Sequence, residues 1–76
     1  MPSLDQLAVG QRAHVKCVEG DDSVVQRLLE MGLYEGQELE VVGLAPLGDP
    51  IEIRLQDYRL SLRRSEARLV VVIAST

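Results

Sequence analysis

Residues 51–63 read IEIRLQDYRLSLR, and this stretch decides the fold. Apolar residues occupy alternate positions on both sides of a turn at Asp57. A period of two indicates half-buried strands, and a short polar turn between two such strands indicates a β-hairpin. We therefore expect strands over residues 51–56 and 58–63. The side chains expected to face the core are Ile51, Ile53, Leu55, Leu60 and Leu62.

Residues 12–18 predict a strand nearer the start of the chain. Ala13, Val15 and Cys17 fall on one face, and polar residues fall on the other. We expect Cys17 to be a small core residue, which is the usual role of a lone cysteine with apolar neighbours. His14, the one histidine, should lie exposed on the opposite face. The two side chains therefore cannot share a metal or act as a nucleophile and its base.

A helix is expected over residues 22–31. Asp21, Asp22 or Ser23 can cap its N-terminus, because short polar side chains accept hydrogen bonds from the free N–H groups of the first turn. Apolar residues then follow at helical spacing. Gly32 stands where a left-handed residue commonly ends a helix.

Residues 38–45 predict another strand, although two adjacent valines before Gly43 interrupt its alternation. A β-bulge at Gly43 explains the interruption. Two prolines and a glycine make residues 46–50 a loop. Within it, Asp49 is expected to accept hydrogen bonds from nearby backbone N–H groups in a turn.

Two short helical turns and a last strand complete the chain. Ser3 and Gln6 have the spacing of a capping box, which predicts a helical turn from there to about Val9. Residues 65–67 suit a second helical turn, and residues 69–73 suit a final buried strand.

Together these elements predict a mainly β fold. Five short strands fit a small barrel, because closing the sheet protects edges that would otherwise be exposed. One α-helix is inserted between the first and second strands, and short helical turns lie near the N-terminus and before the last strand. The 76 residues leave room for one domain, residues 1–76.

Composition and charge exclude several classes of function. The net charge of −4 argues against nucleic-acid binding, which depends on clustered Lys and Arg. The N-terminus lacks the pattern of a signal peptide, and the longest apolar run, residues 69–74, is too short to span a membrane. A lone cysteine excludes an internal disulfide and is compatible with a reducing compartment. We expect a soluble, cytoplasmic protein.

Charge is unevenly distributed along the chain. Residues 1–52 carry 3 basic and 10 acidic side chains, whereas residues 53–76 carry 5 basic and 2 acidic ones. Arg54, Arg59 and Arg63 should point away from the core, and the first two lie on paired strands. These arginines form either an ordinary solvated face or a patch for an acidic protein partner.

The predicted helix offers a second candidate surface. Leu28 and Leu29 are adjacent, so their side chains point about 100° apart around the helix. Either both lie in the core, or one of them contacts a partner. The candidate partner-binding residues are Leu28, Leu29, Met31, Arg54, Arg59 and Arg63.

A catalytic or metal-ligating constellation is not evident in the sequence. Glu38 and Glu40 lie two residues apart on one polar face and could chelate a hard cation, but a single strand supplies too few converging ligands. We expect no enzymatic activity, no cofactor and no metal site.

Several motifs together resemble the ferrous iron transport protein A family in order and spacing. They are Leu28-Leu29-Glu30-Met31-Gly32-Leu33, Gly36, Ala45-Pro46-Leu47-Gly48-Asp49-Pro50, Leu60-Ser61-Leu62-Arg63 and Glu66-Ala67. The resemblance extends from Leu4 to Ile73, and the segment from Ala45 to Pro50 is its most specific part.

This resemblance implies an SH3-like barrel that works as an accessory protein. It implies a partner, the cytoplasmic part of the ferrous iron transporter, which is a membrane GTPase, and a role in modulating iron uptake. The alternative that it implies is a metal-responsive module, similar to the C-terminal SH3-like domain of iron-dependent repressors, that binds a transition metal directly. Apolar barrel edges and exposed leucines also allow a weak homo-oligomer.

Overall fold

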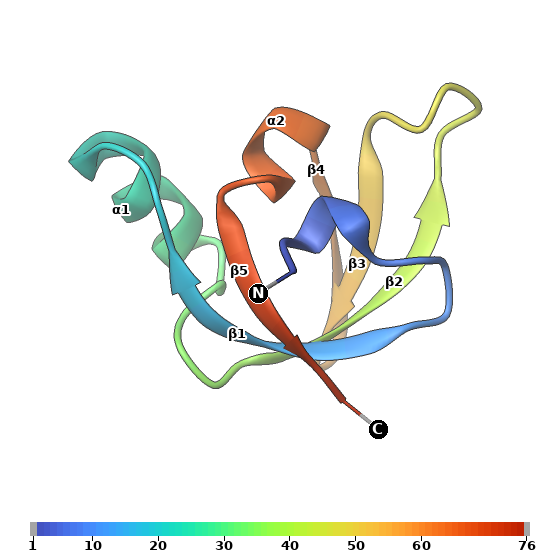
Figure 1. Ribbon diagram of the computed structural model, residues 1–76, viewed down its shortest axis with the longest axis horizontal. Coiled ribbons are helices and arrows are strands. Elements are labelled where there is room, and N and C mark those ends of the chain that lie inside the picture. Colours follow the sequence, from blue (N-terminus) through green and yellow to red (C-terminus); the bar gives the residue numbers. More distant parts are fainter. Residues whose placement is uncertain (1, 76) are drawn as a thin grey trace.

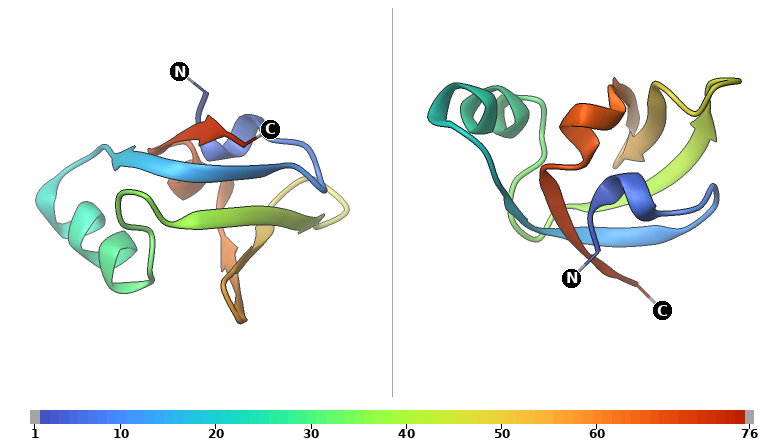
Figure 2. Two further views of the ribbon diagram at one scale, coloured as in Figure 1. Left: turned by 90° about the horizontal axis from the view of Figure 1, so that it is seen from below. Right: turned by 45° about the horizontal axis from the view of Figure 1, so that its top comes forward.

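Five antiparallel strands form one sheet in the computed structural model, which describes residues 2–75 (Figure 1). Their spatial order is β4-β3-β2-β1-β5, so β4 and β5 lie at the two ends. Figure 2 shows that the sheet curls strongly and that the β3–β4 hairpin turns away from β1 and β5. The strands are β1 (Arg12–Val18), β2 (Glu38–Leu44), β3 (Ile51–Leu55), β4 (Tyr58–Leu62) and β5 (Val70–Ala74).

Three short helical elements accompany the sheet. The predicted inserted helix is confirmed as α1 (Asp22–Glu30), and the turn before the last strand is α2 (Arg64–Ala67). The N-terminal turn, η1 (Leu4–Gln6), is shorter than predicted. It ends because Leu7 takes an extended conformation and packs into the core, so the helical turn does not reach Val9.

The core lies inside the curl of the sheet and consists of aliphatic side chains. The hairpin residues predicted to face inward do so, with Leu60 only partly buried. Leu4 and Leu7 from the N-terminus and Ala67 from α2 close the open side. The buried set is Leu4, Leu7, Ala13, Val15, Leu28, Leu33, Leu39, Val41, Ile51, Ile53, Leu55, Leu62, Ala67, Val70 and Val72.

Two β-bulges shift the strand register, and only one of them was predicted. The register between β2 and β3 shifts between Val41 and Gly43, which confirms the bulge expected at Gly43. A second shift occurs between Val15 and Cys17 in the pairing of β1 with β5. The prediction that Cys17 lies in the core is therefore wrong: Cys17 is exposed, and Val18 packs against the core instead.

Both ends of α1 follow the expected capping chemistry. The Asp21 carboxylate accepts hydrogen bonds from the Val24 N–H at 3.0 Å and from the Ser23 hydroxyl at 2.8 Å. These two bonds, the Val24 one first, hold the pKa of Asp21 below its usual value. At the other end, the N–H groups of Gly32 and Leu33 donate to the carbonyls of the last turn, which is the geometry of a Schellman cap.

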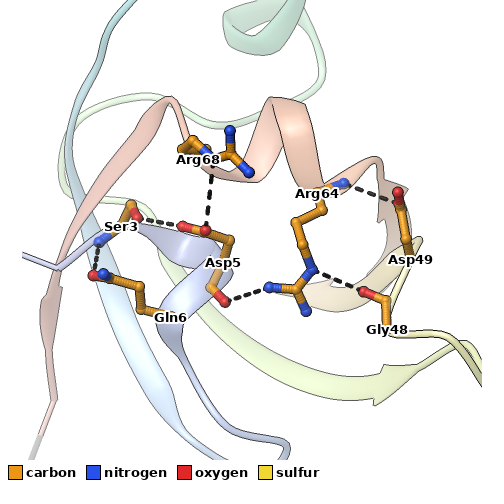
Figure 3. A network of polar contacts seen from close by, with 7 residues as sticks. All are labelled: Ser3, Asp5, Gln6, Gly48, Asp49, Arg64 and Arg68. Carbon is orange, nitrogen blue, oxygen red and sulfur yellow. Dashed lines mark hydrogen bonds and ion pairs between the residues drawn. The ribbon is translucent and has the colours of Figure 1, made fainter.

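Arg64 joins three separate segments on the open side of the sheet (Figure 3). Its Nε donates to the Gly48 carbonyl at 3.1 Å, and its Nη1 donates to the Asp5 carbonyl at 2.9 Å. Its backbone N–H donates to the Asp49 carboxylate at 3.0 Å. Asp49 therefore caps α2 rather than its own loop, which corrects the prediction of a local turn contact.

Replacing Arg64 with alanine should lower the free energy of unfolding by about 1–2 kcal/mol, because two half-buried hydrogen bonds from a charged donor are lost. Arg64→Lys should recover at most part of this loss, since one ammonium cannot reproduce the two-point guanidinium contact. Urea titration followed by circular dichroism measures both effects. Wild-type stability in the alanine variant would show that Arg64 does not hold the segments together.

Candidate functional site

Four charged residues lie side by side across the outward face of the sheet. Arg12 pairs with Glu40, Glu40 pairs with Arg54, and Arg54 pairs with Arg59 in the strand registers. The row runs from β1 through β2 and β3 to β4. We call this set, Arg12, Glu40, Arg54 and Arg59, the arginine row.

The ion pairs of the arginine row are unequal. The Arg54 guanidinium contacts the Glu40 carboxylate closely, whereas Arg12 Nε lies 4.0 Å from the same carboxylate. Arg59 stands opposite Arg54 and reaches out of the row to Glu52, with its Nη1 3.4 Å from Glu52 Oε1. The Glu40 carboxylate therefore pairs with two arginines of the row, whereas Arg59 pairs with Glu52, which lies outside the row.

A shallow groove of about 300 Å³ is lined by three members of the arginine row, Arg12, Glu40 and Arg54. Gln37, at the end of the turn after α1, is also part of its lining and is only 7% exposed. Its Nε2 donates to the Glu38 carbonyl at 3.1 Å. The groove residues are Arg12, Gln37, Glu38, Leu39, Glu40, Arg54 and Gln56.

The structure separates the two helix leucines. Leu28 is fully buried, whereas Leu29 is 40% exposed. Met31 is partly buried against the core, and its carbonyl accepts a hydrogen bond from the Tyr58 hydroxyl at 2.8 Å. Met31 thus adjoins the start of β4, where Tyr58 pairs with Leu55 on the face of the hairpin opposite Arg54 and Arg59. Leu28 therefore belongs to the core and is not part of the candidate partner-binding surface.

Arg63 lies apart from the arginine row. It precedes α2, and its backbone N–H donates to the Glu66 carboxylate at 3.0 Å. The predicted set therefore divides: Arg54 and Arg59 are neighbours, Met31 contacts Tyr58 on the other face of the hairpin, and Arg63 stands at the far end of β4.

The side chains considered as metal ligands do not converge. His14 and Glu38 are cross-strand partners on β1 and β2, and Glu40 is engaged by two arginines. Within residues 2–75, His, Cys, Asp and Glu side chains do not assemble into a group of three that could hold a metal ion. Exposed Cys17 lines a second groove of about 450 Å³ together with Lys16 and Arg68.

Sequence reasoning missed the contribution of Arg12, Glu40 and Gln37 to this face. The alternation of residues 12–18 and 38–45 put Arg12 and Glu40 on polar faces, but their register could not be read from either strand alone. Gln37 lies in a turn, where a buried amide has no periodic signal.

None of the helices in the described part of the chain is long and apolar enough to cross a membrane.

Comparisons with known proteins identify a family. The family model described as "FeoA domain" matches residues 3–74. A fusion protein of Fe(2+) transport protein A and Fe(2+) transporter FeoB from Porphyromonas gingivalis is 42% identical over 69 residues. That match covers 91% of this chain but only 8% of the fusion protein.

Solved structures share the fold. The solution structure of the FeoA protein from Chlorobium tepidum is 39% identical, with a TM-score of 0.91, over 99% of this chain and 71% of that one. FeoA from Stenotrophomonas maltophilia, a prokaryotic SH3 domain protein solved with zinc, is 32% identical, with a TM-score of 0.83, over 96% and 91% of the two chains. The predicted SH3-like, mainly β fold is thereby confirmed.

A manganese-dependent transcriptional repressor has a similar fold. Its TM-score is 0.87 at 14% identity, over 96% of this chain and 36% of that chain. At this identity the likeness concerns the fold alone.

Proposed function

The chain belongs to the FeoA family, and on that premise we propose that it is an accessory module that binds the cytoplasmic part of a ferrous iron transporter and modulates iron uptake. The transporter implied by the family resemblance is a membrane GTPase. The proposal places the module in the cytoplasm, beside the membrane only through its partner.

The main support for this proposal is the fusion protein from Porphyromonas gingivalis. There, a segment 42% identical to this chain is covalently joined to a FeoB transporter. Fusion keeps two parts at high local concentration, which benefits parts that must meet repeatedly. FeoA from Stenotrophomonas maltophilia has likewise been put forward as a ferrous iron transport activating factor.

The contact surface that we propose combines the exposed members of the predicted set. Leu29 supplies an apolar contact on α1, and Met31 adjoins β4. Arg54, Arg59 and Arg63 supply positive charge in a chain whose net charge is −4. Opposite charges on two partners speed association and fix their relative orientation.

Calorimetric titration of the full chain with the purified cytoplasmic part of the transporter tests the proposal. The titration is run without nucleotide, with GDP and with a non-hydrolysable GTP analogue. We expect a dissociation constant of about 100 μM or tighter in at least one state. The absence of binding in all three states would contradict the proposed function.

A matched pair of variants tests the surface. Leu29→Gln removes an apolar contact at the proposed site, whereas Leu47→Gln changes a leucine that is 96% exposed on the β2–β3 loop. We expect about tenfold weaker binding for the first variant and unchanged binding for the second. Equal effects of the two substitutions on the dissociation constant would show that Leu29 on α1 is not part of the contact.

Direct metal binding is the alternative that the resemblance implied, and FeoA from Stenotrophomonas maltophilia was solved with zinc. The manganese-dependent repressor shares the fold at 14% identity, and the His, Cys, Asp and Glu side chains of residues 2–75 do not form a group of three that could hold a metal ion.

A further inference from the structure

We propose that the arginine row binds a carboxylate-bearing, extended segment of a protein partner, and that Glu40 occupies this site within the free chain. The partner's carboxylates would replace Glu40 beside Arg12 and join Arg54 and Arg59. This inference deepens the proposed function, because it gives the chemistry of the partner segment at that surface.

The unequal charges of the row are the first argument. Arg12 and Arg54 share the one carboxylate of the row, that of Glu40, and Arg59 reaches out of the row to Glu52. The Arg12 side chain is 67% exposed and lies 4.0 Å from Glu40. Exposed ion pairs of this kind contribute little stability, so a partner's carboxylate can replace that of Glu40 beside Arg12 with little loss of stability. Arg12 is thus available for a second carboxylate.

The register of the hairpin is the second argument. Arg54 and Arg59 are direct cross-strand partners on β3 and β4. Like charges in that position repel each other, and a carboxylate placed between them relieves the repulsion. Because arginine presents a planar fork of donors, each side chain can hold a carboxylate at two points.

The groove supplies a third argument. Gln37 is 93% buried at the edge of the row, since its exposed fraction is 7%. Its Nε2 donates to the Glu38 carbonyl, and its Oε1 is open to solvent in the groove, because no buried side-chain N or O atom of residues 2–75 lacks a hydrogen-bond partner. An acceptor held in a groove suits a backbone N–H donor. An extended peptide brings such donors together with its side-chain carboxylates.

Strand spacing predicts the pattern of the acidic segment. Arg12 and Arg54 are separated by β2, so their backbones stand about 10 Å apart at the usual spacing of neighbouring strands. An extended chain in the polyproline II conformation advances about 3.1 Å per residue with three residues per turn, so side chains three residues apart share one face. Two carboxylates three residues apart therefore match the two arginines on either side of Glu40.

Other occupants fit the surface less well. A nucleic acid would meet a chain with a net charge of −4, and the row lacks the interleaved aromatic side chains of a single-strand platform. A second copy of the chain is the other occupant that the test must distinguish. Both occupants are included below as outcomes.

The first experiment titrates the ¹⁵N-labelled full chain with a synthetic ten-residue peptide. Its two glutamates are three residues apart, and a control peptide carries glutamine at both positions. We expect amide shifts at the arginine row with the first peptide only, and weaker binding as salt rises from about 0.05 M to about 0.5 M. No shifts at about 5 mM peptide would overturn the proposal.

Two arginine variants make the test specific. Arg12 and Arg68 are matched, because their side chains are 67% and 69% exposed and their ion-pair distances are 4.0 and 3.9 Å. Arg12→Ala should weaken binding of the acidic peptide about three- to tenfold, and Arg68→Ala should leave it unchanged. Equal weakening would indicate general charge attraction and overturn the site.

Replacing Glu40 with glutamine should change the affinity for the acidic peptide in the opposite direction. Removing the internal carboxylate frees Arg12 and Arg54, so the acidic peptide should bind about three- to tenfold more tightly. Unchanged or weaker binding would show that Glu40 is not a competitor and would overturn the proposal. Preferential binding of a single-stranded oligonucleotide would overturn the proposal in favour of a phosphate-binding surface. Amide shifts that depend only on protein concentration would overturn it in favour of contact with a second copy of the chain.

The transporter's cytoplasmic part separates the two proposals. If it binds with equal affinity to the wild type and to Arg12→Ala, the arginine row is not the site, while the proposed function stands. If it does not bind the wild type, the proposed function fails. In that case, peptide binding with the expected variant pattern would still support the carboxylate site.

Discussion

Replacing Leu28 with alanine is expected to lower the free energy of unfolding by about 2–5 kcal/mol, because it removes a fully buried side chain from the core. The same change at Leu29, which is 40% exposed, should cost less than about 1 kcal/mol. A chain of 76 residues has a total stability of about 4–11 kcal/mol, so the Leu28 variant stands close to unfolding.

Urea denaturation followed by circular dichroism measures both variants under one condition. Equal losses at the two positions would contradict the division of α1 into a core side and an exposed side. The comparison also has a functional use, because only Leu29 can be changed in a binding assay without disturbing the fold.

Replacing Gly32 with alanine is expected to cost about 2–3 kcal/mol through two separate effects. Gly32 has a φ of +106°, a conformation that costs a residue with a side chain about 1–2 kcal/mol. An added Cβ would also overlap the Tyr58 hydroxyl and lie 3.3 Å from Leu55 Cδ1. Moving Tyr58 aside breaks its hydrogen bond to the Met31 carbonyl, which contributes about 1 kcal/mol.

A control and a second-site change separate the two effects. Gly36 has a φ of +88° with nothing within 4 Å of an added Cβ, so Gly36→Ala should show the backbone cost alone. Tyr58→Phe removes the hydroxyl, and in that background Gly32→Ala should cost about as much as Gly36→Ala. An undiminished cost in the phenylalanine background would show that the Tyr58 contact is not the cause.

Much of the fold follows from local sequence pattern. The hairpin was predicted because its alternation is regular, and α1 was predicted because a cap, helical spacing and Gly32 agree. The bulge at Gly43 was predicted from two adjacent valines. Cys17 and Val18 form a similar adjacent pair in β1, and the bulge there was missed because Cys17 also fitted simple alternation.

Contacts between distant segments could not be predicted in this way. Arg64 follows the hairpin as one more charged residue, and its bonds to Gly48 and Asp5 exist only after the chain folds. The arginine row likewise depends on contacts between segments that are far apart in the sequence. Arg12 and Arg54 lie far apart in the sequence, and only the register through Glu40 on β2 brings them to one line.

The central claim is that this chain docks on the cytoplasmic part of a ferrous iron transporter through the face that carries the arginine row. Chemical-shift mapping of the ¹⁵N-labelled chain against that part, in each nucleotide state, tests it most directly. We predict perturbed amides at Arg12, Glu40, Arg54 and Arg59. An unchanged spectrum in every state, or perturbations confined to the second groove around Cys17 and Arg68, would contradict the claim.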